Sequence, residues 1–157
     1  MPDFDIMKAQ LLAFAEEDPG FVPLLSNASA LIWESMDGLN WAGFYIVTGG
    51  RLVLGPFQGK TACIEIPVGR GVCGTAVERG TSVVVPDVHE FPGHIACDSA
   101  SESEIVVPIR KGGRIVGVLD LDSPKKNTFG EEDRVGLEEF VRLLEDALPD
   151  DFPAALL

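Results

Sequence analysis

The sequence predicts an α+β fold, in which the N- and C-terminal helices pack on one side of an antiparallel β-sheet. Two pairs of strand-like runs are each separated by a short glycine-rich turn, which is typical of β-hairpins. Apolar stripes with helical spacing lie toward both ends of the chain. Repeated strand–helix–strand units are missing, so a parallel sheet is not expected. The chain has 157 residues, the length of one domain, and we expect residues 1–157 to form a single domain.

Three stretches are expected to form the longer helices. Residues 5–16 combine apolar residues with good helix formers, and residues 22–36 place apolar residues on one stripe before Gly38. The stretch Thr128–Glu131 has the pattern of a capping box, which predicts that the last helix begins there. A short helix is expected over about Gly74–Glu78. The apolar stripe of the last helix comprises Leu137, Phe140, Val141, Leu144 and Leu148.

Two hairpins are expected to supply most of the sheet. The first joins Trp41–Val47 to Arg51–Phe57. The second joins Glu104–Arg110 to Arg114–Asp122 and is rich in β-branched residues, which favour strands. Further strands are expected in the apolar runs Ala62–Val68 and Ser82–Val85.

The charge of the chain argues against two classes of partner. It has 12 Lys and Arg residues against 25 Asp and Glu residues, a formal net charge of −13. A surface this negative repels phosphate backbones and anionic lipid, so neither nucleic acid nor a membrane is expected as a partner. We see no secretory signal in the first residues and no apolar run of about 18 residues. We therefore expect a protein of the cytoplasm.

The cysteines Cys63, Cys73 and Cys97 are odd in number, which does not suit a structural disulfide framework. They are either small buried hydrophobes or reactive or metal-bound sulfurs. Cys73 lies at the start of the expected short helix, where the helix N-terminus would lower its thiol pKa and its apolar neighbours would raise it. The surrounding Gly69–Gly74 matches a dinucleotide-binding motif, but the helix that follows is too short for one.

A long polar connection over residues 86–103 carries both histidines, His89 and His94, together with Cys97. Long loops in compact domains are often functional. A histidine beside a thiol can stabilise a thiolate, which is what a cysteine nucleophile needs. Alternatively, the two histidines and Cys97 would bind a metal with Cys63 as the fourth ligand, although their spacing matches no common zinc pattern.

Carboxylates form another candidate site. Asp120 and Asp122 alternate along an expected strand, so both point to one face, roughly 7 Å apart. They continue a face that Val116 and Val118 begin, and Glu104 opens the partner strand. Acids at the end of an apolar face are costly unless they bind a cation, share a proton or accept strong hydrogen bonds. Turn capping would explain Asp122 but not Asp120, so ligand binding is favoured.

Trp41 and Tyr45 share one face of the first expected strand. They are either ordinary core residues or an aromatic wall beside a small ligand.

Several stretches carry a family resemblance that covers about residues 22–148. They are NWAGFY (Asn40–Tyr45), LVLGPFQGKTAC (Leu52–Cys63), GRGVCG (Gly69–Gly74), DVHEFPGHIACDSASESEIVVPI (Asp87–Ile109) and GVLDLDSP (Gly117–Pro124). With the spacing of the three cysteines, they resemble the free methionine-(R)-sulfoxide reductases, a family built on the GAF fold. The resemblance implies a single GAF-like domain.

The resemblance also implies a thiol reductase that needs no metal or organic cofactor. Cys97 would attack the sulfoxide sulfur and become a sulfenic acid, and Cys63 would resolve it as a Cys63–Cys97 disulfide. Cys73 would be an auxiliary resolving thiol, and thioredoxin would reduce the disulfide. This chemistry is reasonable, because a sulfenic acid condenses readily with a neighbouring thiol.

The substrate implied by the resemblance is free methionine-(R)-sulfoxide, bound by a monomer or a homodimer. Glu104, Asp120 and Asp122 match the substrate-binding acids, and one of them should hold a proton because closely spaced acids cannot all stay ionised. Trp41 and Tyr45 match an aromatic wall around the thioether methyl. The alternative function is that of a GAF domain that senses a small molecule without catalysis.

Overall fold

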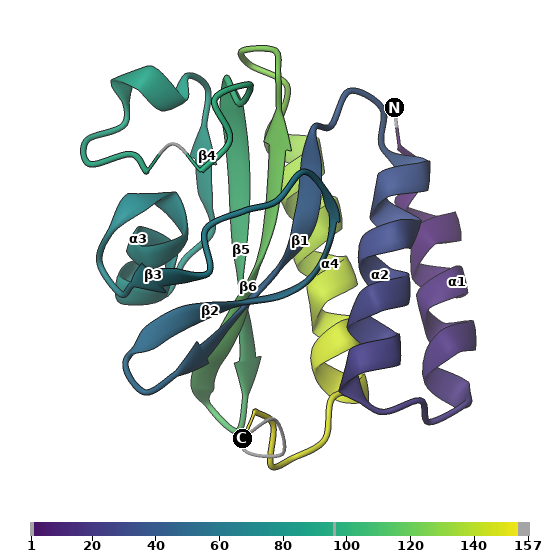
Figure 1. The fold of residues 1–157 in the computed structure, drawn as a ribbon. Helices are drawn as coiled ribbons and strands as arrows, with labels where there is room; N and C mark the ends of the chain where they lie inside the picture. The colour runs from purple at the N-terminus through teal and green to yellow at the C-terminus, as the bar shows by residue number, and fades with distance from the viewer. Residues whose placement is uncertain (1, 96, 154–157) are drawn as a thin grey trace.

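Six β-strands form one antiparallel sheet in the spatial order β3-β2-β1-β6-β5-β4 (Figure 1). The computed structural model describes residues 2–95 and 97–153. The strands are β1 (Trp41–Thr48), β2 (Arg51–Gly59), β3 (Glu65–Pro67), β4 (Val83–Val85), β5 (Ser103–Lys111) and β6 (Arg114–Ser123). The two predicted hairpins are confirmed as β1–β2 and β5–β6, with glycines of positive φ in both turns.

Three long helices cover one face of the sheet, as predicted (Figure 1). They are α1 (Phe4–Glu16), α2 (Phe21–Ser35) and α4 (Glu131–Ala147). Their apolar stripes meet the sheet in a core of fully buried residues such as Leu11, Ile32, Phe44, Leu119 and Phe140. In the part of the chain described, no helix is both long and apolar enough to cross a membrane.

A short helix, α3 (Gly71–Arg79), packs on the opposite face and creates a second, smaller core. It begins earlier than the predicted Gly74, because the backbone N–H of Gly74 already donates to the carbonyl of Arg70. Residues 86–103 lie on this same side of the sheet and include the 3₁₀ helix η1 (Val88–Glu90) (Figure 1). The functional residues discussed below belong to this side.

Two details of the sequence prediction are wrong at the ends of elements. The predicted capping box does not form, because α4 has Gly130 as its N-cap and the Asp133 carboxylate accepts the Gly130 N–H at 2.8 Å. The Thr128 hydroxyl instead donates to the carbonyl of Lys125 at 2.8 Å. The apolar run from residue 62 to 68 forms only the short strand β3, and Cys63 lies before this strand, in a disulfide with Cys97.

A β-bulge in β6 corrects a third expectation. The register between β5 and β6 shifts between Ile109 and Arg110, which leaves Val116 as an extra residue on β6. A bulge breaks the alternation of faces. Val116 therefore enters the core under the long helices, whereas Val118 lies on the α3 side. The face that carries Asp120 is thus begun by Val118 alone.

Phe140→Ala should lower the free energy of unfolding by about 3–5 kcal/mol, because it leaves a cavity in the core between α4 and the sheet. Val135→Ala on the same helix is the matched control, since Val135 is 43% exposed and should change stability by less than about 0.5 kcal/mol. Urea unfolding of both variants measures the difference. Equal losses for the two would show that the core is not where the structure places it.

Candidate active site

The register of three neighbouring strands places the predicted acids side by side. Asp122 on β6 lies opposite Glu104 on β5 and opposite Trp41 on β1. Asp120 lies two residues away from Asp122 on β6 and is opposite Gly43. Their side chains point to the α3 side of the sheet, where they line one cavity. The prediction that Asp120 and Asp122 share a face with Glu104 on the partner strand is confirmed.

This cavity of about 40 Å³ is enclosed by the sheet, α3 and the segment 86–103. Seven of the eight residues predicted to be catalytic or substrate-binding line it: Trp41, Tyr45, Cys73, Cys97, Glu104, Asp120 and Asp122. The eighth, Cys63, is bonded to Cys97. His94, which the sequence offered as a partner for a thiol or a metal, also lines the cavity. The other lining residues were not predicted to be functional, namely Ala62, Ile66, Gly71, Val72, Ile95, Asp98 and Ser101.

Trp41 and Tyr45 form a buried aromatic layer, each with only 2% of its surface exposed. Their rings stack with centroids 5.8 Å apart, and the ring of Phe57 stacks on that of Trp41 with centroids 5.1 Å apart. Both residues therefore serve the second core and line the cavity at the same time. The rings are core residues, as one alternative held, and their place in the lining leaves a role beside a ligand as a prediction.

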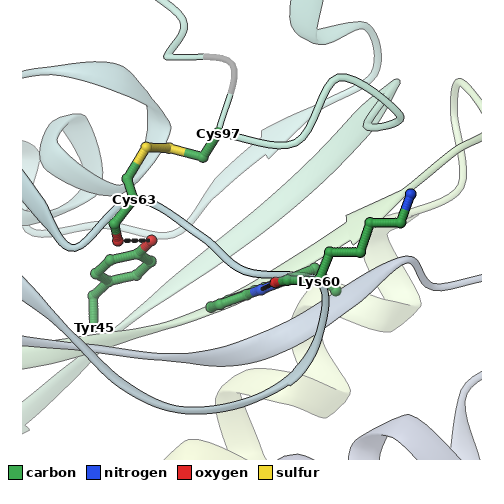
Figure 2. The surroundings of a disulfide bond; sticks show 5 residues. Tyr45, Lys60, Cys63 and Cys97 are labelled. Atoms are coloured by element: carbon green, nitrogen blue, oxygen red, sulfur yellow. Dashed lines mark hydrogen bonds between the residues drawn. A yellow bond between two sulfur atoms is a disulfide. The ribbon is translucent and has the colours of Figure 1, made fainter.

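The polar ends of the two rings hold the chain segment that carries Cys63. The Trp41 Nε1–H donates to the carbonyl of Lys60 at 3.1 Å, and the Tyr45 hydroxyl donates to the carbonyl of Cys63 at 2.8 Å (Figure 2). A buried tyrosine or tryptophan usually finds such a partner. The aromatic layer thus fixes the backbone on which one of the two sulfurs stands.

Cys63 and Cys97 form a disulfide with their Cα atoms 5.4 Å apart (Figure 2). It joins the β2–β3 connection to the segment 86–103 across the mouth of the site. The two residues come from segments far apart in sequence, and the sequence alone offered no geometric reason to pair them. Cys73 is left as a free, buried thiol.

The surroundings of Cys73 determine the direction in which its pKa is shifted. Burial raises the pKa of this thiol well above its ordinary value, and the nearby carboxylates of Asp120 and Glu104 raise it further. The helix N-terminus does not overcome these effects. Cys73 is therefore a protonated thiol, which does not suit the nucleophile that attacks the substrate.

The three carboxyl groups share protons rather than all being ionised. Burial raises the pKa of Glu104 and of Asp122 well above the ordinary range, and the charge of Asp120 raises both further. Burial also raises the pKa of Asp120, but hydrogen bonds from Glu104 and Cys73 oppose this shift. Glu104 and Asp122 are therefore the acids that favour their protonated forms, and Asp120 is the acid for which hydrogen bonds oppose the shift most. Asp120 Oδ1 has no hydrogen-bond partner among the described residues, so it is open to a ligand.

Asn40 connects the aromatic layer to the segment that follows Cys97. Its side-chain amide donates to Asp98 Oδ2 at 2.9 Å and to Ser101 Oγ at 3.1 Å. Its backbone N–H donates to the carbonyl of Asp122 at 2.9 Å. The sequence offered no sign of this role beyond the position of Asn40 next to Trp41.

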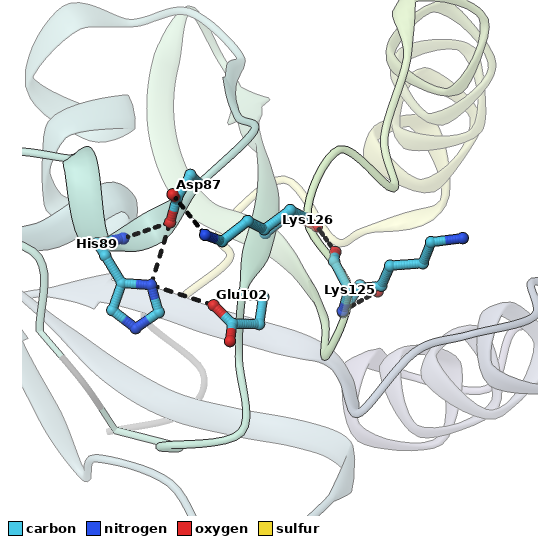
Figure 3. A network of polar contacts seen from close by, with 7 residues as sticks. Asp87, His89, Glu102, Lys125 and Lys126 are labelled. Atoms are coloured by element: carbon cyan, nitrogen blue, oxygen red, sulfur yellow. Dashed lines mark hydrogen bonds and ion pairs between the residues drawn. The ribbon is translucent and has the colours of Figure 1, made fainter.

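His89 lies outside the cavity and ties the two ends of the segment 86–103 together. Its Nδ1 lies 3.1 Å from carboxylate oxygens of both Asp87 and Glu102, and Lys126 Nζ lies 3.2 Å from Asp87 (Figure 3). The hydrogen bond from the His89 backbone N–H and the contact with Lys126 lower the pKa of Asp87. The network holds the base of the segment that presents Cys97.

The metal site considered from the sequence is not assembled. Cys63 and Cys97 share their sulfurs in a disulfide, and His89 faces Asp87 and Glu102 instead. Asp87, His89 and Glu102 do offer ligand atoms within 4.8 Å of one another, but the Lys126 ammonium already neutralises Asp87. Another such group combines Cys73 with two of the buried acids. Metal ligands must be deprotonated, and the raised pKa values of Cys73 and Glu104 oppose that.

Comparison with known proteins gives a consistent family. A GAF domain family model matches residues 24–148. The free methionine-R-sulfoxide reductase of Escherichia coli is 53% identical over 131 residues, which is 83% of this chain and 79% of that protein. The structure of fRMsr of Staphylococcus aureus in its reduced form has a TM-score of 0.92 and 46% identity, and the match covers 95% of this chain and 97% of that one.

A structure of free methionine-R-sulfoxide reductase from Neisseria meningitidis in complex with its substrate gives a TM-score of 0.90 at 42% identity. The match covers 96% of this chain and 91% of that one. The fold agrees with these comparisons. The chain belongs to the free methionine-R-sulfoxide reductase family of GAF-domain proteins.

Proposed function

We propose that residues 1–157 form one GAF-like unit that reduces free L-methionine (R)-sulfoxide to L-methionine, with Cys97 as the nucleophile. The observation that carries this proposal is the Cys63–Cys97 disulfide at a cavity lined by three acids and two aromatic rings. Such a disulfide is the expected product of one turnover. The family relationship supports the same activity.

The first step moves the sulfoxide oxygen to the enzyme. The Cys97 thiolate attacks the sulfoxide sulfur while Glu104 donates its proton to the sulfoxide oxygen. The sulfur–oxygen bond of the substrate then breaks, and the hydroxyl is transferred to Cys97, which becomes a sulfenic acid. Methionine is released, and the substrate has gained the two electrons that Cys97 has lost. Proton donation by a positioned acid is worth about 10²–10⁴ in rate.

Asp120 suits the substrate's α-ammonium group. Hydrogen bonds from Glu104 and Cys73 support its ionised form, and its Oδ1 has no hydrogen-bond partner among the described residues. A methionine residue within a peptide has no such ammonium, so this contact would select the free amino acid. Trp41 and Tyr45 would surround the thioether methyl, which is the apolar end of the substrate.

The second step regenerates the thiol. Cys63 attacks the sulfenic acid, water leaves, and the disulfide forms; thioredoxin then reduces it with two electrons. Cys73 would act as an auxiliary resolving thiol, since it lines the same cavity as Cys97. Such a cycle fits the cytoplasm, where thiols are kept reduced. Either a monomer or a homodimer would suffice for it.

The cavity of the disulfide form is small for a ligand. Pockets that enclose small molecules usually measure roughly 300–1,000 Å³, against about 40 Å³ here. We infer that reduction of the disulfide releases Cys97 and opens the cavity. Substrate would then bind only to the reduced enzyme.

Single-turnover measurements on cysteine variants test the order of steps. Cys97→Ser should release no methionine, because the group that accepts the oxygen is gone. Cys63→Ser should release about one methionine per chain and then recycle slowly, because only the resolving thiol is lost. Rapid quenching and amino-acid analysis give the amounts. A full equivalent of methionine from Cys97→Ser would contradict the assignment.

The variant Glu104→Gln tests in two ways whether Glu104 holds a proton. Turnover should fall at least about tenfold, because the amide cannot supply the proton. Wild-type Glu104 has a folded pKa above its ordinary value of 4.5, so its contribution to stability is present below that value and is lost as the pH rises through the folded pKa. Glu104→Gln should therefore be more stable than wild type at high pH, and this advantage should shrink as the pH falls toward 4.5.

Urea unfolding over a pH series measures this difference. Glu34→Gln is the matched control, because Glu34 is exposed on α2, on the other side of the sheet. A pH-independent difference between Glu104→Gln and wild type would show that Glu104 does not hold a proton.

A further inference from the structure

Ile64 follows Cys63 directly and is largely in solvent. It is 73% exposed, the highest fraction for a large apolar side chain among the residues described. Pro67 and Val68, a few residues further along the chain, are exposed as well. Exposed apolar side chains therefore follow the disulfide along the chain, before, at the end of and just after the edge strand β3.

The backbone that presents Ile64 is held at several points. The carbonyl of Ile64 accepts the N–H of Leu54 at 2.9 Å, and the carbonyls of Cys63 and Lys60 accept the hydrogen bonds from the two pocket aromatics. Figure 2 shows the contact between Tyr45 and Cys63 next to the disulfide. The side chain of Ile64 is thus exposed to solvent on a backbone that hydrogen bonds hold in place.

The two sulfurs of the disulfide differ in their surroundings. Cys97 belongs to the lining of the substrate cavity, among the buried acids. Cys63 is outside that lining, and its neighbour along the chain is the exposed Ile64. Both cysteines are half-buried, and a large molecule that docks on Ile64 lies next to Cys63 along the chain.

We propose that Ile64 is the docking anchor for the protein dithiol that reduces the enzyme, and that this dithiol attacks the sulfur of Cys63. The inference rests on the proposed function, which requires the Cys63–Cys97 disulfide to be reduced in every cycle. Apolar residues at the centre of an interface exclude water and carry much of the binding energy. The chain's net charge of −13 repels an anionic thiolate. An apolar contact of this kind would offset that repulsion.

The exchange is balanced with two electrons. A thiolate of the reductant attacks Cys63 Sγ, the Cys63–Cys97 bond breaks, and Cys97 leaves as a thiolate, ready for the next substrate. The second thiol of the reductant loses its proton and attacks the mixed disulfide, which oxidises the reductant and releases Cys63 as a thiolate that takes up a proton. The thiol with the lower pKa is the better leaving group, and a nucleophilic cysteine is of that kind.

A comparison of two reductants tests the docking role of Ile64. Ile64→Ser should raise the KM for thioredoxin about tenfold, while turnover with dithiothreitol stays that of wild type. Ile6→Ser is the matched control, because Ile6 is 57% exposed but lies on α1, on the far side of the sheet. It should change neither rate.

Other results would overturn the proposal. An unchanged KM for thioredoxin in Ile64→Ser would remove the anchor, and an equal loss with both reductants would mean that the variant only disturbs the pocket. Failure of the proposed function itself looks different, since wild type would then release no methionine even with dithiothreitol.

The site of attack can be trapped. A thioredoxin variant that lacks its second cysteine cannot complete the exchange, so it should remain joined to the oxidised enzyme. Peptide mass spectrometry should find the link at Cys63. A link at Cys97 would contradict the assignment of the attacked sulfur.

Discussion

The register of β1, β6 and β5 is the constraint on which the site depends. It sets Trp41, Asp122 and Glu104 in one row across the sheet, with Asp120 in the next row. A slip of one residue would turn the acids into the apolar core under the long helices. Gly43 shows how close the packing is, because a Cβ there would lie 2.2 Å from the Cβ of Phe57. Large apolar cores on both faces hold this register against the cost of burying three carboxyl groups.

The same residues connect binding with redox chemistry. Trp41 and Tyr45 line the cavity with their rings, and their polar ends hold the segment that carries Cys63. Asn40 holds the residues after Cys97, and His89 holds the base of that segment. The two cysteines thus stand on segments that are fixed from the pocket side and from the loop side. This explains how sulfurs far apart in sequence can meet at the mouth of one small cavity.

Much of the fold could be predicted because its elements have strong local signals. Glycine turns marked both hairpins, and alternation of apolar and polar residues placed Asp120 and Asp122 on one face. Local patterns failed where longer-range contacts decide. The bulge at Val116 depends on the pairing of β6 with β5. The Thr128 hydroxyl donates to the carbonyl of Lys125 in the same loop and so does not cap α4. The pKa of Cys73 follows from acids on other strands, and the contacts of Asn40 join segments that only the folded chain brings together.

The most direct test of the central claim is methionine release by the reduced protein with dithiothreitol, measured in parallel on three substrates. These are free methionine-(R)-sulfoxide, the free (S) epimer and a peptide-bound sulfoxide. The account predicts release from the free (R) epimer alone, because the aromatic layer and the acid that binds the ammonium both select it. Equal release from the peptide would contradict the role of Asp120. No release from any of the three, with all thiols shown to be reduced, would contradict catalysis and favour a GAF domain that only binds a small molecule.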